Sequence, residues 1–215
     1  MKLMFRMNLK FLSYVLAPVS AILLLSAATV HADCYDRRAP GIDWSGCKKT
    51  NKMLDDSDFS GSNMTKTDMT RSSATSSSFR NADLTKAVGY RANFDRVDLT
   101  NTILTKSEFS RASFKNAIIK NVDWSKAELG RIDFSGAKLD NVNFSYTNLS
   151  RAEFDNAELS EVDFKGAYTY LTHFEGVDLR RVKNLSQMQL DLACGNSETR
   201  LLPAFWMPDS WPCTE

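Results

Sequence analysis

Nine cationic residues repeat at a spacing that would place them in two straight rows, and rows of cations are suited to binding anions. Four of them are lysines and five are arginines, and within each of these two sets the residues recur every twenty positions. Such a surface could bind an acidic glycan, a lipid phosphate or an acidic patch on a protein. The two sets are Lys66, Lys86, Lys106 and Lys126, and Arg71, Arg91, Arg111, Arg131 and Arg151.

A second interpretation of these cations needs no ligand, because tandem duplication would copy solvated turn residues into the same rows. Neighbouring cations about 5 Å apart repel each other by only ~1 kcal/mol in water, and by less in salt. Asp68, Glu108 and Glu128 are expected on the same face, where they would offset part of the charge. A further row is better explained by the tolerance of asparagine for turn conformations; it contains Asn81, Asn101, Asn121 and Asn141.

Catalytic chemistry finds little support in the sequence. His173 is expected beside Asp133 and Glu153, but a lone histidine with a neighbouring carboxylate is typical of a surface pair. The chain has no G-x-S-x-G, P-loop, H-E-x-x-H or GxGxxG motif. The sequence therefore predicts no catalytic residue, no metal and no cofactor, and an enzyme with an unrecognised site is kept only as a third hypothesis.

Four cysteines form two short-range pairs near opposite ends of the chain, Cys34 with Cys47 and Cys194 with Cys213. Four cysteines allow three pairings, and proximity favours these two. A zinc site is disfavoured because no C-x-x-C motif occurs. A disulfide that closes a loop of about 14 residues stabilises a protein by roughly 3 kcal/mol in the chain-entropy account.

A large apolar residue recurs at almost every fifth position from Trp44 to Leu179, and this pattern predicts the structure that would position the residues above. We call each of these positions a centre. This step gives 28 centres without an insertion, of which 24 are large and apolar. Two residues before the centre, 27 of 28 positions are small or β-branched, and only Lys52 departs. A step of five fits neither a helix nor a strand, so it indicates a repeat structure. The exceptional centres are Lys49, Ala74, Gly89 and Thr169.

Three segments, "ADLTK" (82–86), "AELGR" (127–131) and "AEFDN" (152–156), show the repeat most clearly. They resemble the motif of the pentapeptide-repeat family, and the resemblance covers about residues 42–182. It implies an all-β fold, a right-handed quadrilateral β-helix with four repeats per coil. The small residue and the central residue would then point inward, and 28 repeats would make about seven coils.

A coil of four repeats predicts interior ladders of side chains that recur every twenty residues. Gly89 interrupts one such column, where it could leave a dent that Tyr90 fills, mark an irregular turn or line a ligand pocket. Two complete columns are Phe94, Phe114, Phe134, Phe154 and Phe174, and Leu99, Ile119, Leu139, Leu159 and Leu179.

The two ends of such a rod must be closed, because each presents unpaired backbone and an exposed core. Residues 33–47 are predicted to form an N-terminal disulfide cap. At the other end, residues 183–215 are predicted to form a helix and a disulfide-closed cap. The helix would begin at the capping box "SQMQ" (186–189) and run through Cys194. Three aromatic residues would pack on the last coil or contact a partner or membrane: Phe205, Trp206 and Trp211.

Residues 1–32 have the layout of a secretory signal peptide, with three basic residues, an uncharged stretch at 11–30 and small residues before a cleavage point after Ala32. An uncleaved membrane anchor is the alternative. Cleavage would leave 24 basic and 26 acidic residues. This balance does not suggest a nucleic-acid partner.

The sequence thus predicts an exported, single-domain β-helix in the periplasm or outside the cell, with no stable membrane span after cleavage. The expected function is non-enzymatic, as a protein-interaction or structural component of the bacterial envelope. The expected partner is an unidentified protein or an anionic envelope component. The alternative is a dedicated anion-binding module that uses the lysines and arginines.

Overall fold

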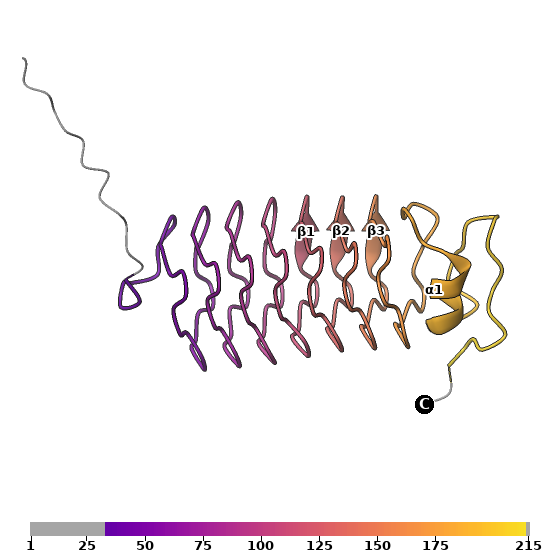
Figure 1. Cartoon of the computed structure of the whole chain (residues 1–215), viewed down its shortest axis with the longest axis horizontal. Coiled ribbons are helices and arrows are strands. Elements are labelled where there is room, and N and C mark those ends of the chain that lie inside the picture. Colours follow the sequence, from indigo (N-terminus) through magenta and orange to yellow (C-terminus); the bar gives the residue numbers. More distant parts are fainter. Residues whose placement is uncertain (1–32, 214–215) are drawn as a thin grey trace, which may run out of the picture.

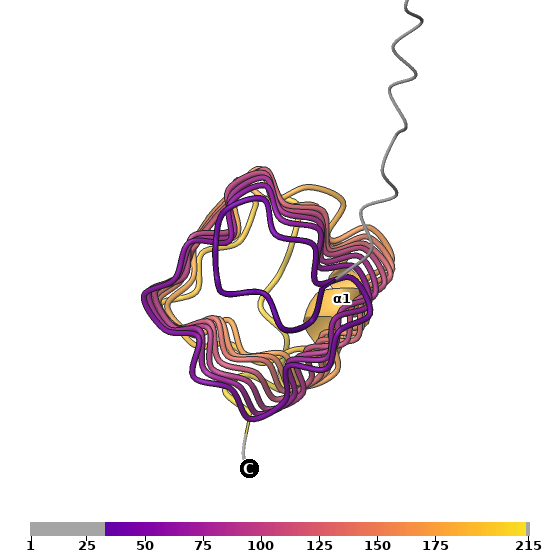
Figure 2. The same cartoon turned by 90° about the vertical axis from the view of Figure 1, so that its left-hand side faces the viewer.

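The computed structural model describes residues 33–213, which wind into a straight rod of stacked coils (Figure 1). Viewed along the rod, the coils superpose as a four-sided outline (Figure 2). The predicted β-helix is therefore confirmed. The predicted signal peptide, residues 1–32, lies outside the described residues.

Each coil pairs with the next through parallel bridges between residues twenty positions apart. The series runs from Asp43 opposite Asn63 to Asp163 opposite Lys183. A twenty-residue offset on all four sides means that four five-residue repeats complete one coil, as predicted.

The regular strands are short because the chain turns every five residues. Strand β1 (Ile118–Lys120) pairs in parallel with β2 (Lys138–Asp140), and β2 pairs in parallel with β3 (Glu158–Ser160). Ile119 lies opposite Leu139 in this sheet. Elsewhere in the described coils a side is reduced to a single bridging residue.

A residue with positive φ occupies most corners between two sides. These corner residues include 22 non-glycine residues with φ between 51° and 62°. After the corner, the small interior residue donates its N–H back to the preceding centre, as Ala112 does to the Phe109 carbonyl at 3.0 Å. Corner side chains therefore project from the rod, and small and central side chains point inward.

The interior contains the predicted ladders. Phe94 and Phe114 stack with ring centroids 5.0 Å apart and an interplanar angle of 7°. Further along the ladder, the ring centroids of Phe134 and Phe154 are 5.1 Å apart, and those of Phe154 and Phe174 are 5.4 Å apart. A second aromatic ladder, which includes Trp124 and Phe144, runs along the opposite wall and meets the first edge-on. The four walls thus close on a filled core.

Several hydroxyl groups at the small interior positions donate to backbone carbonyls of the preceding coil. Thr102 Oγ1 donates to the Phe79 carbonyl, and Thr147 Oγ1 donates to the Trp124 carbonyl, each at 2.7 Å. A threonine can therefore be buried without leaving its hydroxyl unpaired.

Two of the exceptional centres are explained by their surroundings. Lys49 lies at the N-terminal end, where its Nζ is 3.4 Å from the Trp44 ring centroid and donates to the Cys34 carbonyl at 2.7 Å. At Gly89, an added Cβ would lie 2.2 Å from the Phe109 ring. Of the alternatives for Gly89, the one in which Tyr90 fills a dent is wrong, because the Phe109 ring of the next coil occupies this space.

Helix α1 (Gln187–Leu192) follows the last full coil at the C-terminal end of the rod (Figure 1), and its Leu190 is buried. Both hydrogen bonds of the predicted capping box are present at Ser186. The helix ends two residues before the predicted Cys194. Thr169 Oγ1 donates to the Gln189 carbonyl at 2.8 Å, so this exceptional centre holds the helix.

The coil pattern continues beyond α1 as a partial extra turn that the five-residue step did not predict. Cys194 bridges to His173 and Arg200 bridges to Asp178. These offsets are 21 and 22 residues rather than twenty, because the helix replaces one side of the coil.

Both predicted disulfides form, Cys34 with Cys47 and Cys194 with Cys213, and each joins Cα atoms 5.4 Å apart. Each disulfide ties a terminal segment to one end of the rod. Within residues 33–213, no helix has the length and apolar character needed to cross a membrane.

Candidate functional site

The nine predicted cations occupy two corners that flank one side of the rod. We call this side, with the nine residues, the basic face. All nine side chains are exposed, and their backbone φ angles lie between 56° and 62°. Coils in a parallel sheet are about 4.8 Å apart, so the cations form two rows with that repeat. The structure therefore brings the predicted set together along the rod.

Within the described part of the chain, none of the nine cations forms an ion pair with a carboxylate. The predicted acidic neighbours lie on the basic face but make other contacts. Asp68 accepts a hydrogen bond from the Thr70 N–H at 2.9 Å, and Glu128 accepts one from the Asn148 side chain at 2.9 Å. The positive charge of both rows is therefore presented to solvent.

Three cations on the opposite side of the rod behave differently, because each is paired with a carboxylate of the next coil. The contrast shows that this repeat readily places a carboxylate beside a cation. The opposite-face pairs are Arg80–Asp98 at 2.9 Å, Lys120–Asp140 at 3.1 Å and Lys138–Glu158 at 3.5 Å.

The asparagine row has the structural role expected of it. Asn101 donates its side-chain amide to Asn81, Asn121 donates to Asn101, and Asn141 donates to Asn121, each at 3.0 Å. All four residues are corner residues, with φ angles between 52° and 60°. Their amides are engaged with one another along the rod.

Three exposed tyrosines lie where the basic face approaches the C-terminal end, and we call them the tyrosine platform. Tyr146, Tyr168 and Tyr170 are 59%, 51% and 42% exposed. The rings of Tyr168 and Tyr170 stack with centroids 6.2 Å apart and an interplanar angle of 12°. This cluster was not among the predicted site residues. The twenty-residue step contained the signal, because Tyr146 follows Lys126 in the lysine row.

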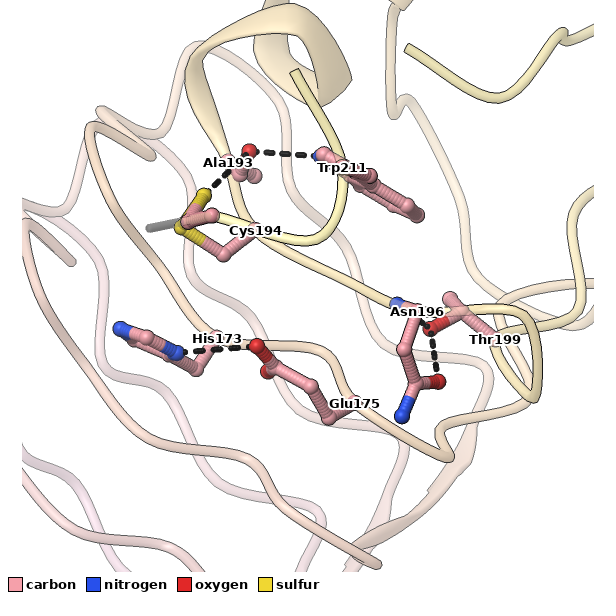
Figure 3. The surroundings of a disulfide bond; sticks show 8 residues. His173, Glu175, Ala193, Cys194, Asn196, Thr199 and Trp211 are labelled. Atoms are coloured by element: carbon pink, nitrogen blue, oxygen red, sulfur yellow. Dashed lines mark hydrogen bonds and ion pairs between the residues drawn. A yellow bond between two sulfur atoms is a disulfide. The ribbon is translucent and has the colours of Figure 1, made fainter. Parts of the chain in front are cut away.

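A second polar cluster lies beside the C-terminal disulfide, on the side next to the basic face (Figure 3). His173 Nδ1 is 3.1 Å from Glu175 Oε1. The predicted neighbour Glu153 bridges to His173 through the backbone, but the side-chain contact of His173 is with Glu175. One oxygen each of Asp155 and Glu175 is buried without a hydrogen-bond partner among the described residues.

Burial raises the pKa of the Asp155 carboxyl, and the negative charge of Glu175 raises it further. Burial and the charge of Asp133 likewise raise the pKa of Glu153. The cluster borders an open depression of about 500 Å³. No group of three or more His, Cys, Asp or Glu side chains in residues 33–213 is arranged to hold a metal ion. The lining of the depression is Arg131, Arg151, Glu153, Leu171, His173, Cys194 and Cys213.

Asp155→Asn is expected to raise the free energy of unfolding at pH 7 by about 0.5–1 kcal/mol, after allowance for solvent screening of a half-buried group. The amide removes repulsion from Glu175. Because the folded-state pKa of Asp155 is raised, wild type regains this stability as the pH falls through that pKa toward the unfolded value of about 3.9. Urea unfolding at pH 7 and near pH 4 measures the difference, which should disappear at the lower pH.

Asp178→Asn provides a control of opposite sign. Hydrogen bonds from Arg180 lower the pKa of Asp178 to about 2. The stability that this carboxylate contributes is present above its unfolded pKa and is lost as the pH falls through about 2. This variant should therefore be less stable than wild type at pH 7. A stability loss at pH 7 for Asp155→Asn would contradict the electrostatic account of the cluster.

The three C-terminal aromatic residues do not form one surface. Trp211 is buried over Gly195, and its indole N–H donates to the Ala193 carbonyl at 2.6 Å (Figure 3). Phe205 packs against the core, whereas Trp206 is 65% exposed. The predicted packing on the rod therefore holds for two of them. Because Trp211 is enclosed, Trp206 is the one of the three whose side chain is mostly exposed, and a partner surface at this end stays a prediction.

The stacked four-sided coils and their filled interior define a parallel β-solenoid whose outer faces carry its variable chemistry. Two stretches match the corresponding family, residues 54–88 as "Pentapeptide repeats (8 copies)" and residues 107–183 as "Pentapeptide repeat region". The chain belongs to the pentapeptide repeat family. No curated protein sequence matches the chain.

Several solved structures are similar to this chain at low sequence identity. HetL, a pentapeptide repeat protein involved in heterocyst differentiation regulation from the cyanobacterium Nostoc sp. strain PCC 7120, is 17% identical with a TM-score of 0.48; the match covers 82% of this chain and 93% of HetL. The plasmid-mediated fluoroquinolone resistance protein QnrB1, in a trypsin-treated form, is 15% identical with a TM-score of 0.40, over 77% of this chain and 85% of QnrB1. A pentapeptide repeat protein of the Arabidopsis thaliana thylakoid lumen is 20% identical with a TM-score of 0.21, over 58% of this chain and 63% of that protein.

Proposed function

We propose that the protein is a non-enzymatic, exported interaction protein of the bacterial envelope, and that the basic face is its binding surface for an anionic partner. The observation that carries this proposal is the set of nine exposed cations without carboxylate partners in the described chain. A rigid rod fixes their spacing before the partner arrives, so little ordering is required on binding.

Two further observations support export and a surface role. The two disulfides are typical of proteins in oxidising compartments such as the periplasm or the cell exterior. The residues of the interior are occupied with packing and with backbone hydrogen bonds, so recognition depends on the outer faces and ends.

The proposal predicts salt-sensitive binding that depends on the corner arginines. The triple variant Arg91→Glu, Arg111→Glu, Arg131→Glu should bind inorganic polyphosphate, used as a simple polyanion, at least tenfold more weakly than wild type, a difference of about 1.4 kcal/mol. Affinity is measured by titration of the full chain, expressed with its disulfides formed, at low and high salt. The circular dichroism spectrum should be unchanged, because the three side chains point outward.

The matched control reverses three cations on the opposite face, through Arg80→Glu, Lys120→Glu and Lys138→Glu. It changes the net charge by the same amount but leaves the basic face intact. It should retain most of the wild-type affinity. Equal losses in both triple variants would show that only net charge matters, and binding that survives the basic-face reversal would overturn the proposal.

The exposed residues at the C-terminal end support a second candidate surface. Met188, Trp206 and Met207 are 75%, 65% and 44% exposed. Contact through these apolar side chains would resist salt. A partner recovered from envelope extract at low and high salt alike, and lost in Trp206→Ala, would therefore assign recognition to this end of the rod.

A further inference from the structure

The tyrosine platform continues the two rows of the basic face rather than forming a separate surface. Tyr146 occupies the corner that follows Lys126 in the lysine row, and its φ of 58° matches the 59° of that lysine. Beside the arginine row, the Arg151 N–H donates to the Tyr170 carbonyl at 2.8 Å. A ligand that extends along the cations therefore meets aromatic rings in the last full coil.

The local backbone makes room for these rings. An added Cβ at Gly166 would lie 2.9 Å from the Tyr146 ring, so the ring rests directly against the backbone of the next coil. Gly166 is followed two residues later by Tyr168, whose ring stacks on Tyr170 across Thr169. The platform thus consists of rings held against the rod with exposed surface toward solvent.

Exposed aromatic rings beside cations narrow the chemistry of the ligand. Cations alone would accept any polyanion, whereas an aromatic face packs well against a flat, partly apolar ring. The C–H-rich face of a pyranose sugar is such a ring. Tyrosine hydroxyls can also hydrogen-bond sugar hydroxyls at the edge of the stack.

The carboxylates of the basic face favour a sugar polymer over a phosphodiester polymer. Asp68, Glu108 and Glu128 lie in the row between the two rows of cations. A carboxylate repels either kind of polyanion, but it can accept hydrogen bonds from the ring hydroxyls of a polysaccharide, which a polyphosphate chain does not offer. Single-stranded nucleic acid would also stack on tyrosine, yet the two disulfides indicate an oxidising compartment in which acidic glycans are the more accessible linear polyanions.

We propose that the basic face and the tyrosine platform together bind a linear acidic polysaccharide, with sugar carboxylates at the corner cations and a sugar ring stacked on Tyr168 and Tyr170. This inference rests on the proposed function, because it assigns a ligand class to the same face. Arginine suits this ligand, since its guanidinium donates two parallel hydrogen bonds to one carboxylate. Several weak contacts along a rigid rod add to a useful affinity for a polymer.

The test compares polygalacturonate, which supplies carboxylates on sugar rings, with inorganic polyphosphate, which supplies charge without rings. The double variant Tyr168→Ala, Tyr170→Ala should bind polygalacturonate about tenfold more weakly than wild type. Its affinity for polyphosphate should be unchanged. Tyr168→Phe with Tyr170→Phe should restore most of the affinity for polygalacturonate, because the rings are retained.

The matched control removes two exposed apolar side chains from other faces, through Ile103→Ala and Ile118→Ala, which are 45% and 50% exposed in wild type. It should bind both polymers as wild type does. Thermal unfolding of the Tyr→Phe double variant should follow wild type, and the Tyr→Ala double variant should remain folded at the temperature of the binding assay, since the two rings are about half exposed.

The outcomes separate this inference from the proposed function. Wild type that binds polyphosphate but not polygalacturonate would retain the anion-binding face and overturn the polysaccharide. If wild type binds neither polygalacturonate nor polyphosphate, both proposals are overturned. If the Tyr168→Ala, Tyr170→Ala variant binds polygalacturonate as wild type does, the proposed role of the tyrosine platform is overturned. If wild type binds an oligothymidylate more tightly than polygalacturonate, and this binding depends on the tyrosines, the face is assigned to single-stranded nucleic acid instead.

Discussion

Replacing Phe134 with alanine is expected to lower the free energy of unfolding by about 3–5 kcal/mol, because it removes a fully buried ring from the middle of the rod. Along its own ladder, the Phe134 ring packs against the rings of Phe154 and Phe114, with centroids 5.1 Å and 5.8 Å away. It also meets the Trp124 ring edge-on at 5.4 Å. The coils above and below are held apart by backbone bridges, so the cavity can collapse only in part.

Equilibrium unfolding in urea measures this loss, and Phe134→Leu is the matched control. Leucine is the alternative that the repeat itself uses at its centres, so this variant should lose less than about 1.5 kcal/mol. A loss below about 1 kcal/mol for Phe134→Ala would show that neighbouring coils rearrange around the gap. The ladder would then not be a rigid stack.

Removing the C-terminal disulfide through Cys194→Ala and Cys213→Ala is expected to lower the free energy of unfolding by about 3 kcal/mol. The disulfide closes a loop with a sequence separation of 19 residues, which contains Trp211 and Phe205. Trp211 contacts the rod through its hydrogen bond to the Ala193 carbonyl and its packing over Gly195. Release of this segment should expose the indole and shift tryptophan fluorescence to longer wavelength.

The N-terminal disulfide is the matched control, because its sequence separation of 13 residues predicts a stabilisation of similar size. Cys34→Ala with Cys47→Ala should lower stability without exposing Trp211. Because Trp44 lies at the N-terminal end beside Lys49, both disulfide variants also carry Trp44→Phe, and fluorescence and urea unfolding together then distinguish the two ends. Unchanged fluorescence in the Cys194/Cys213 variant would mean that packing alone keeps the tail docked.

The interior of the rod could be predicted from the sequence because one physical rule applies at every coil. Each centre must fill the same space, and each small residue must leave room beside it. The twenty-residue offset therefore predicted the ladder from Phe94 to Phe174 and the two rows of cations. The capping box at Ser186 was also readable, since it depends only on residues three positions apart.

The exceptions could not be predicted because each depends on contacts between segments far apart in the sequence. Lys49 covers the N-terminal end, Gly89 yields its space to Phe109, and Thr169 binds the backbone of α1. The partial turn after α1 is similar, since the offsets change once a helix replaces one side. A pattern that assumes identical coils contains no information about such sites.

At the candidate site, the sequence predicted where the cations lie but not their lack of carboxylate partners. Lysines that look alike in the repeat have different surroundings, as Lys138 pairs with Glu158 across one coil boundary. Glu153 lies beside His173 in the next coil, as the row predicted, but the side-chain contact between His173 and Glu175 depends on side-chain conformation and could not be read from the row. The tyrosines could have been found by sorting every outer position, rather than only the charged ones.

Because the five-residue step is unbroken, the number of repeats that precede a residue determines on which side of the rod that residue lies. Deleting one repeat would preserve the inward pattern of small and large residues, but it would turn every later residue by one side, a quarter of a revolution. A deletion between Lys106 and Lys126 would bring Arg131 to the corner of the lysine row and Gly136 to the corner of the arginine row. Only insertions or deletions of twenty residues keep the rows continuous. Natural length variation that conserves the basic face should therefore occur in whole coils.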